Sequence, residues 1–323
     1  ECFYNQKKLR ERRKIPVVHD DQHGTAIISC AGLINGLKVV GKDIGAVKMV
    51  VSGAGAAAIA CLDLMVSVGL KRENITVCDS KGVIWEGREP NMEPTKARYA
   101  QKTEGRTLGD VIVGADIFLG LSTAGVLKPE MVARMADKPL IFALANPNPE
   151  ILPADAKAVR PDCIVATGRS DFPNQVNNVL CFPFIFRGAL DVGATTINEE
   201  MKLACVKAIA VQAEAEASDI VASAYGGQEL SFGSEYIIPK PFDPRLIVKI
   251  APAVAEAGMA SGVATRPITD WVAYRGQLNN FVWHSGLIMK PVFAAARENP
   301  KRIIFSEGES EKVLRAVQQV VDE

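Results

Sequence analysis

The chain has 323 residues and equal numbers, 37 and 37, of basic and acidic side chains, so its formal net charge is zero. A balanced charge without a basic stripe disfavours nucleic acid as the main partner, and 48% apolar with 23% charged residues argues against disorder. No apolar stretch reaches the ~18 uncharged residues of a membrane span and none resembles a secretory signal, so we expect a cytoplasmic protein with no membrane partner.

Short apolar runs rich in β-branched residues alternate with helical patterns through the first half of the chain. We predict strands at residues 47–51, 75–78, 117–119, 140–144 and 163–166. Helical patterns such as 56–68 and 129–135 lie between them. Continuous apolar strands that alternate with helices are typical of a parallel sheet covered on both faces. The sequence therefore predicts an α/β fold, a Rossmann-like doubly wound parallel sheet.

The pattern changes to helix from Asn177 onward, with a strongly helical stretch at 199–217 and a Gly- and Pro-containing segment at 225–244. At the end, residues 301–305 predict a strand, and a helix with one apolar side is predicted to begin near Ser306. A lone strand and helix cannot bury both apolar faces. We therefore expect the sequence to be a piece of a longer protein, with a further α/β domain after Glu323.

The first strand runs into a glycine turn and a helix start, with the pattern GxGxxA. Gly53 suits the tight turn, Gly55 lets the backbone approach a pyrophosphate, and the small Ala58 allows the helix to pack closely on the strand. The amides from Gly53 to Ala57 would then face the phosphates. The cofactor-binding candidates in this turn are Gly53, Ala54, Gly55, Ala56 and Ala57. A glycine turn that serves only the packing of the helix on the strand is the alternative, but the acid described next favours a dinucleotide.

Asp79 ends the next strand, where an acid accepts a hydrogen bond from the adenosine ribose of NAD. Its carboxylate would repel the 2′-phosphate of NADP. Ser80 and Lys81 follow directly, however, and could bind that phosphate. The sequence leaves the choice between NAD and NADP open at this point.

Other polar residues lie where strands end or helices begin. Asp20 and Asp21 precede a helix, and paired carboxylates suit a hard divalent cation; the alternative is a solvated turn in which Asp21 and Thr25 cap the helix. Asn146 follows an apolar strand, where ligands sit in an open parallel sheet, although an Asn-Pro turn is equally compatible. Similar candidates with a structural alternative are Ser122, Asn177 and Asn178.

Six of these segments resemble the malic enzymes, specifically the bacterial hybrid type with a phosphotransacetylase-like region at the C-terminus. They are Val17-Val-His-Asp-Asp-Gln-His-Gly-Thr-Ala26, Ser52-Gly-Ala-Gly-Ala-Ala57, Cys78-Asp-Ser-Lys-Gly82, Gly114-Ala-Asp-Ile-Phe-Leu-Gly-Leu-Ser122, Ala145-Asn-Pro-Asn-Pro-Glu150 and Phe172-Pro-Asn-Gln-Val-Asn-Asn178. They occur in the family's order over most of the chain. The closing Arg302-Ile-Ile-Phe-Ser-Glu-Gly-Glu309 resembles the opening of the phosphotransacetylase-like domain.

The resemblance implies oxidative decarboxylation of L-malate to pyruvate and CO2, with reduction of NADP or, less often, NAD, and with Mg2+ or Mn2+ as the Lewis acid. It makes Asp21 a metal ligand and gives Asp20 a supporting catalytic role. It places Asn146, Asn177 and Asn178 near malate, with Asn146 also near the nicotinamide. Ser122 would lie near the nicotinamide ribose. The usual NADP preference of hybrid relatives favours a phosphate at Ser80 and Lys81.

The resemblance also implies a domain plan and an assembly. Residues 1–23 would end the metal and substrate region, 24–225 form the NAD(P)-binding domain, 226–300 a mainly helical linker, and 301–323 the start of the phosphotransacetylase-like domain. A homo-oligomer and an acyl-CoA effector at the C-terminal region are further expectations.

The family's remaining metal ligands and its acid–base Tyr and Lys would precede Glu1. We therefore expect these 323 residues alone to lack malic activity. Two other functions remain open: a nucleotide-sensing regulatory module without catalysis, and a metal-independent dehydrogenase of 2-hydroxy acids or amino acids.

Overall fold

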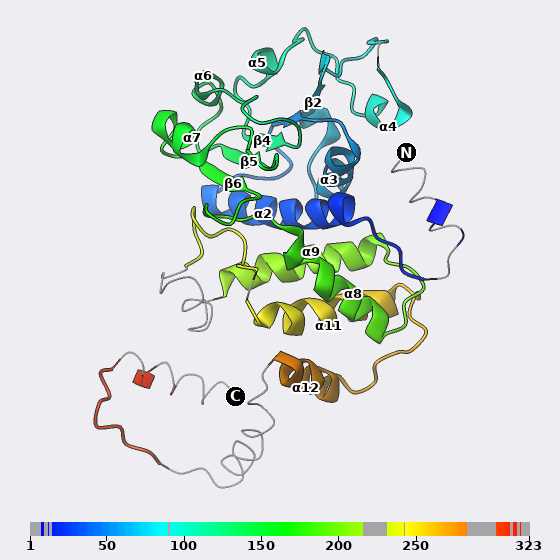
Figure 1. The fold of residues 1–323 in the computed structure, drawn as a ribbon, viewed down its shortest axis with the longest axis vertical. Coiled ribbons are helices and arrows are strands. Elements are labelled where there is room, and N and C mark those ends of the chain that lie inside the picture. Colours follow the sequence, from blue (N-terminus) through cyan, green and yellow to red (C-terminus); the bar gives the residue numbers. More distant parts are fainter. Residues whose placement is uncertain are drawn as a thin grey trace. The chain divides into compact units, whose positions relative to one another are not determined.

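The computed structural model describes residues 8–9, 12, 15–89, 91–215, 231–241, 243–282, 302–310, 313–314 and 317. The chain divides into two compact units, Glu1–Trp271 and Val272–Glu323. In the first unit a sheet lies over a long helix, α2, and further helices lie beyond α2 on the side away from the sheet (Figure 1). Each unit is described by itself.

Six strands form the sheet of the first unit, in the order β3-β2-β1-β4-β5-β6. Their bounds are β1 Met49–Ser52, β2 Ile75–Asp79, β3 Gly82–Val83, β4 Ile117–Gly120, β5 Leu140–Ala143 and β6 Ile164–Thr167. All neighbours pair in parallel except β2 with β3, which are antiparallel. The doubly wound prediction is confirmed, and the five predicted strands match β1, β2, β4, β5 and β6 to within two residues at each end. The short edge strand β3 was not predicted.

Both faces of the sheet are buried, and alternate residues of each strand belong to different cores. Val50, Phe118, Ile141 and Val165 point to one face and pack with apolar residues around the short helices α5, α6 and α7. Their neighbours along the strands, such as Val51, point to the other face and pack with α2, α3, α8, α9 and α11. This two-sided burial explains why the strands are apolar without alternation.

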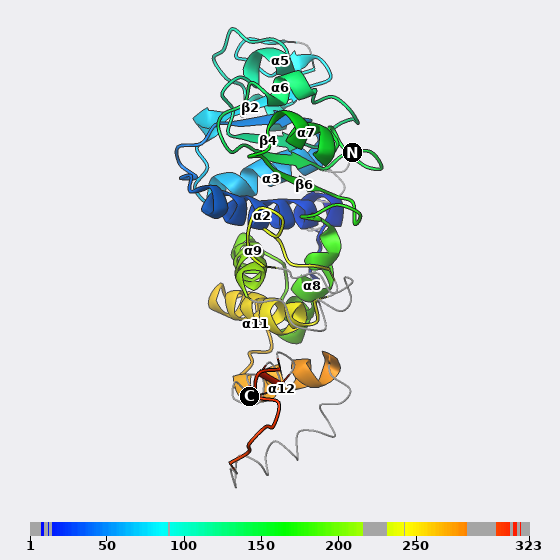
Figure 2. The same ribbon diagram turned by 90° about the vertical axis from the view of Figure 1, so that its left-hand side faces the viewer.

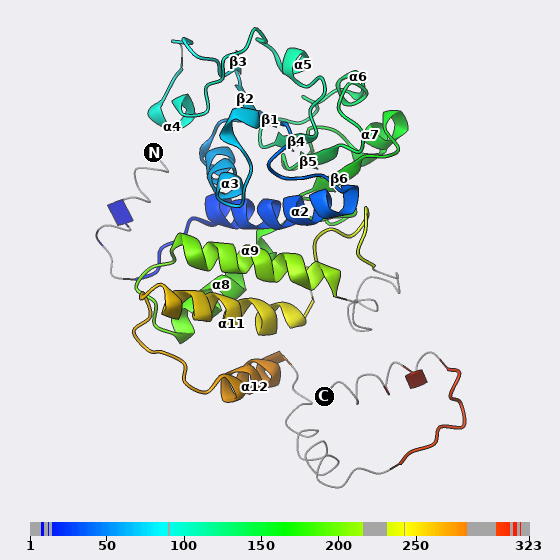
Figure 3. The same cartoon turned by 180° about the vertical axis from the view of Figure 1, so that it is seen from behind.

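The earlier helices of the first unit lie in the connections between strands, and the later helices form a separate layer. The bounds are η1 Asp20–Gly24, a single π-helical turn, α2 Thr25–Val40, α3 Ala56–Ser67, η2 Arg72–Asn74, α4 Pro94–Ala97, α5 Leu108–Val111, α6 Pro129–Val132, α7 Pro153–Val159, η3 Asn178–Leu180, α8 Phe182–Asp191, α9 Glu199–Glu214 and α11 Arg245–Ala260. Figures 2 and 3 show α9 and α11 beyond α2 from two further directions. The predicted helix at 129–135 ends earlier, at Val132.

The segment Asp20–Val40 is long and apolar enough to cross a membrane, but 67% of its apolar window is buried inside the fold. It contacts the sheet on one side and α9 on the other, as a core helix does. The fully buried Asn35 fixes this arrangement, because its amide Nδ2 donates to the carbonyls of Ala210 and Ile237, each at 2.9 Å. An amide buried in a core is tolerated when carbonyls accept its protons.

In the second unit the described residues are fewer. The helix α12 (Trp271–Val282) crosses into it from the last residue of the first unit. The strand predicted at 301–305 is wrong for the described residues 302–305, which belong to no strand; a strand needs a hydrogen-bonded neighbour, and none of the described strands pairs with them. The predicted boundaries at 225 and 300 stay predictions, since residues 216–230 and 283–301 lie outside the described ranges.

Candidate functional site

The glycine turn after β1 leaves a gap at the carboxyl edge of the sheet. Gly53 has φ +116°, and a Cβ on it would lie 2.4 Å from the carbonyl oxygen of Leu121, so this position needs glycine. Its amide donates to the Cys78 carbonyl at 2.8 Å. A Cβ on Gly55, in contrast, would meet no atom within 4 Å. The turn is therefore packed against the protein at Gly53 and open at Gly55.

The open side of the turn lies at the first turn of α3, which begins at Ala56. The first amides of a helix have no partner within the helix and carry the positive end of its dipole. Ala58 is 1% exposed, so the helix packs closely on the sheet here, as the motif predicts. The segment Gly53, Ala54, Gly55, Ala56 and Ala57 thus offers a cradle for an anion, and the predicted pyrophosphate fits it.

Asp79 ends β2 in a buried ion pair rather than as a free acceptor. Its side chain is 7% exposed, and Oδ2 lies 2.5 Å from the Arg88 guanidinium and 3.3 Å from the Lys96 ammonium. Oδ1 accepts the Lys81 amide at 2.8 Å. Burial raises the pKa of Asp79, but the hydrogen bonds from Arg88, the Lys81 amide and Lys96 outweigh burial and hold the pKa below its ordinary value.

This pairing changes the electrostatic argument drawn from the sequence. The single negative charge of Asp79 faces two cations, and Ser80 and Lys81 beside it are exposed. The end of β2 is therefore not a repulsive site for a phosphate. Whether Asp79 also accepts from a ribose stays a prediction.

Ser122 follows β4 and is hydrogen-bonded to the end of β1. Its hydroxyl lies 2.8 Å from that of Ser52, and its amide donates to Oε1 of Glu150 at 3.0 Å. Oε2 of Glu150 accepts the Ala145 amide at 3.0 Å. Burial raises the pKa of Glu150 above its ordinary value, and the bonds from Ala145 and Ser122 offset this only in part.

Asn146 is exposed after β5, at the same edge of the sheet. Its side chain lies beside the end of β6, because its Oδ1 would be 3.2 Å from a Cβ placed on Gly168. A larger residue at 168 would crowd it. The peptide bond between Asn146 and Pro147 is cis. The predicted location at a strand end is therefore confirmed, while its ligand stays a prediction.

The turn η1 and the segment before α8 come together although 150 residues separate them. The Thr25 hydroxyl donates to Oδ1 of Asn178 at 3.2 Å, and Nδ2 of Asn178 donates to the Asp20 carbonyl at 3.4 Å. Burial, reinforced by the charge of Asp21, raises the pKa of Asp20, although a bond from Asn178 lowers it. Asp21 itself is exposed.

The alternative interpretation of these polar residues as helix caps is wrong at some positions and correct at another. No side-chain cap bond forms at the start of η1 or α2, so the interpretation of Asp21 and Thr25 as caps is wrong. Asn177, however, does act as a cap: its Oδ1 accepts the Val179 amide at 3.0 Å. The adjacent Asn178 is the one that reaches η1.

The predicted metal site consists here of Asp20 and Asp21 alone. Within the ranges that the structure describes, no group of three or more His, Cys, Asp or Glu side chains converges. Two carboxylates are fewer than the oxygen donors that Mg2+ or Mn2+ takes. The described residues therefore fit part of a metal site, and no reaction step is derived through a metal.

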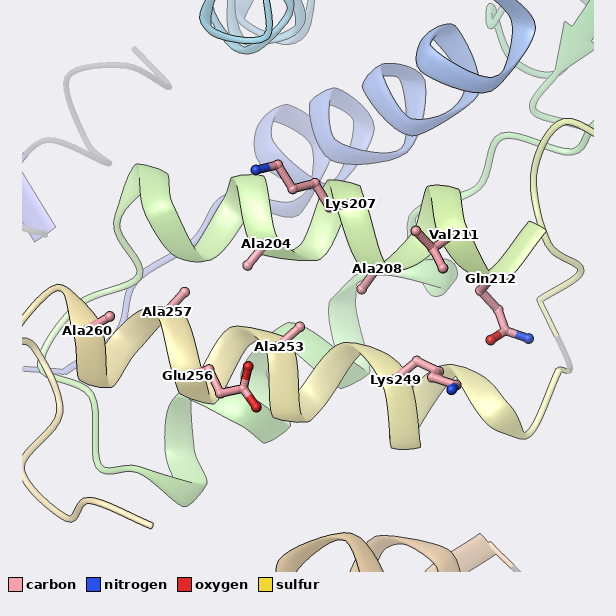
Figure 4. Close-up of a pocket in the computed structure, with 10 residues that line it drawn as sticks. All are labelled: Ala204, Lys207, Ala208, Val211, Gln212, Lys249, Ala253, Glu256, Ala257 and Ala260. Carbon is pink, nitrogen blue, oxygen red and sulfur yellow. The ribbon is translucent and has the colours of Figure 1, made fainter. Parts of the chain in front are cut away.

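A groove of about 480 Å3 lies elsewhere, between α9 and α11 (Figure 4). Alanines of the two helices form much of its lining, with Lys207, Lys249 and Glu256 among the polar residues. None of the candidate residues from the sequence lines this groove. The candidate site is the carboxyl edge of the sheet.

Three residues at that edge were missed by sequence reasoning: Arg88, Lys96 and Glu150. Arg88 follows Asp79 by 9 residues in an irregular segment, and Lys96 follows it by 17 residues on the short helix α4, so no periodicity connects them to it. Glu150 had a usable signal, an acidic residue that follows a Pro-rich turn after an apolar strand and is followed by Ile151 and Leu152.

The comparisons with known proteins agree with this geometry. Residues 22–223 match the family model described as malic enzyme, NAD binding domain. The chain is 68% identical to the NADP-dependent malic enzyme of Escherichia coli (strain K12), over 99% of the chain and 42% of that protein. It is 63% identical to the NAD-dependent malic enzyme of Rhizobium meliloti (strain 1021), over 100% of the chain and 42% of that protein. The chain thus spans 42% of the length of these curated relatives.

Solved structures give the same likeness. The crystal structure of malic enzyme from Pyrococcus horikoshii Ot3 matches with a TM-score of 0.75 and 38% identity, over 92% of this chain and 67% of that one. The malic enzyme of Entamoeba histolytica matches with a TM-score of 0.74 and 34% identity, over 99% and 63%.

The buried pair at β2 predicts a pH-dependent loss of stability. Asp79→Asn should lower the free energy of unfolding at pH 7 by about 3 kcal/mol, because it leaves two cations without their carboxylate. Folding lowers the pKa of Asp79, so its ionised form stabilises the fold. This stabilisation is fully present at pH values above the pKa of the unfolded state, ~3.9, and it is lost as the pH falls through the lower pKa of the folded state. Urea unfolding should show wild type and variant converging as the pH falls.

Asp171 provides the matched control for this prediction. It pairs with Arg169 at 2.6 Å in an exposed position, so Asp171→Asn should hardly change the free energy of unfolding. An Asp79→Asn loss no larger than that of the control would contradict the buried pair.

Proposed function

The chain belongs to the malic enzyme family, and on this premise we propose that it supplies the NADP-binding part of an enzyme that converts L-malate and NADP to pyruvate, CO2 and NADPH. The observation that carries the proposal is the turn after β1, packed at Gly53 and open at Gly55. It lies between β2 and β4, the neighbours of β1 in the sheet. The strands that follow β1 in the chain lie first on one side of it, β2 and β3, and then on the other, β4 to β6, and a dinucleotide binds at such a switch point.

The charges at the end of β2 support NADP over NAD. The 2′-phosphate that distinguishes NADP needs cations and donors at its ribose. Arg88 and Lys96 compensate Asp79, and Ser80 and Lys81 present an exposed hydroxyl and an exposed ammonium beside it. The name of the Escherichia coli relative, an NADP-dependent enzyme, points the same way.

The nicotinamide end of the cofactor would lie over β1, β4 and β5. Ser122, whose hydroxyl is hydrogen-bonded to that of Ser52 at 2.8 Å, would contact the nicotinamide ribose. Asn146, exposed at the end of β5, would hydrogen-bond the carboxamide or a malate carboxylate. Asn178 would bind malate and is oriented from behind by Thr25 and the Asp20 backbone.

When bound, NADP would supply the acceptor for a hydride from malate, and a divalent metal would supply a Lewis acid for the decarboxylation. Among the described residues, Asp21 is the exposed carboxylate that would contribute to holding that metal. Asp20 is partly buried and next to Asn178, and it would have a supporting role, in which it helps to keep the neighbouring site residues in position. The acid–base Tyr and Lys that the resemblance implies are not assigned to any residue here, so we expect the 323 residues alone to bind NADP without oxidising malate.

The metal role of Asp21 is tested by Asp21→Asn in a protein that has the full length of the curated relatives. We expect malate oxidation with Mn2+ to fall by about 100-fold or more. The affinity for NADP should stay unchanged, and electron paramagnetic resonance should show weaker Mn2+ binding. Asp171→Asn is the control and should retain both activity and Mn2+ affinity.

Three results would contradict the proposal. Unchanged activity in Asp21→Asn would remove this carboxylate from the metal site. A protein that binds NADP but turns over no malate with Mn2+ would instead be a nucleotide sensor, and malate oxidation that survives EDTA would indicate a metal-independent dehydrogenase.

The cofactor preference is tested by Lys81→Ala. NADP affinity should fall by about tenfold or more, because an ion pair with the 2′-phosphate is lost, whereas NAD affinity should hardly change. Lys71→Ala is the matched control, since Lys71 is exposed near the opposite end of β2. Equal losses of NADP and NAD affinity, or an equal effect of the control, would contradict the assignment.

A further inference from the structure

Glu150 is a carboxylate buried without a cation. It is 0% exposed, and none of the ion pairs found in the described ranges includes it. Burying an unpaired charge is costly, so proteins retain such groups where hydrogen bonds hold them for a reason. The partners of Glu150 indicate that reason.

Its two oxygens bind the backbones of two different strand ends. Oε1 accepts the Ser122 amide at 3.0 Å, and the Ser122 hydroxyl lies 3.5 Å away. Oε2 accepts the Ala145 amide at 3.0 Å. Ser122 follows β4, and Ala145 immediately precedes Asn146 after β5, so one carboxylate joins both loops of the nicotinamide end.

The backbone around Glu150 fixes the rest of the loop after β4. The Glu150 carbonyl accepts the Leu127 amide at 3.2 Å, and the Pro149 carbonyl accepts the Gly125 amide at 3.1 Å. The Ser122 hydroxyl continues the chain of hydrogen bonds to Ser52, next to the glycine turn. Three strand ends are thus connected through one side chain.

The sheet leaves room for this carboxylate at Gly120. A Cβ there would lie 2.4 Å from the carboxyl carbon of Glu150 and within 2.7 Å of both oxygens. Any larger residue at the end of β4 would displace the group. Glycine is required here by the close approach of the carboxylate, not by its own backbone conformation.

The pair of N–H donors requires a carboxylate in particular. Each oxygen faces one backbone N–H, and an ionised carboxylate accepts strongly on both. A glutamine amide would set a donor against one of the two N–H groups, and protonation of the carboxylate would weaken the hydrogen bond to its hydroxyl oxygen. Either change should release the Ser122 loop or the Asn146 loop.

We propose that Glu150 is a positioning residue that holds Ser122 and Asn146 in place for the nicotinamide and the substrate. The proposal rests on the function proposed above. It gives Glu150 no contact with either ligand: it acts through the two backbone amides.

The test is Glu150→Gln in the protein at the length of its curated relatives, with Glu150→Asp, which keeps two acceptor oxygens. Glu130→Gln, at an exposed position on α6, is the control. We expect Glu150→Gln to lower kcat/KM by about 10- to 100-fold with a larger effect on kcat than on the KM for NADP, because α3 still holds the phosphates. Glu150→Asp should recover part of the loss.

The pH profile separates positioning from mere stability. In the wild type, kcat should fall on the acid side as Glu150 becomes protonated, since protonation removes the negative charge and weakens the hydrogen bonds that hold the two loops. Glu150→Gln should lack this titration and stay low at every pH. The control should keep the wild-type profile.

A measurement on the unmodified protein covers the case in which Glu150→Gln fails to fold. In 15N–1H spectra, the signals of the Ser122 and Ala145 amides should shift together with pH, with one common midpoint. Below that midpoint NADP should still bind, but malate turnover should be slower. Independent shifts of the two amides, or unchanged kinetics in Glu150→Gln, would overturn the inference. If the wild type bound no NADP, the proposed function would fail instead.

Discussion

The register of the parallel strands is the constraint that places every candidate group. Ser52 pairs with Gly120, Gly120 with Ala143, and Ala143 with Thr167. Four strands therefore end at the same level, and the segments that follow them meet at one edge of the sheet. Parallel strands need crossover connections, so residues far apart in sequence become neighbours there. The glycine turn, Ser122, Asn146 and Gly168 all owe their positions to this register.

Two buried carboxylates at that edge are stabilised in different ways. Asp79 is paired with cations, which hold its pKa low and leave the end of β2 favourable for a phosphate. Glu150 has backbone amides instead, and burial raises its pKa. The ion pairs of Asp79 affect which nucleotide binds. The hydrogen bonds of Glu150 affect how the loops around the reactive end of that nucleotide are held.

The sequence allowed the sheet to be predicted well, because buried parallel strands are continuous apolar runs and the glycine motif has a physical reason at each position. It located Asn146 at a strand end and the turn at Gly53 for the same reasons. It could not reveal the partners of Asp79, because Arg88 comes from an irregular segment and Lys96 from the short helix α4, with no periodicity that connects either to β2. Nor could it separate Asn178 from Asn177, since adjacent residues of one type differ only in which way each side chain points.

We expect a nucleotide phosphate to occupy the open side of the turn at Gly55. The most direct measurement is a titration of NADP against the chain and against Gly55→Val, followed by intrinsic fluorescence or calorimetry, with urea unfolding of both. A Cβ at this position would meet no protein atom within 4 Å, so we expect the fold to tolerate the substitution. We expect NADP affinity to be at least about 100-fold weaker in the variant. Equal NADP affinity in the two proteins, with both folded, would contradict it.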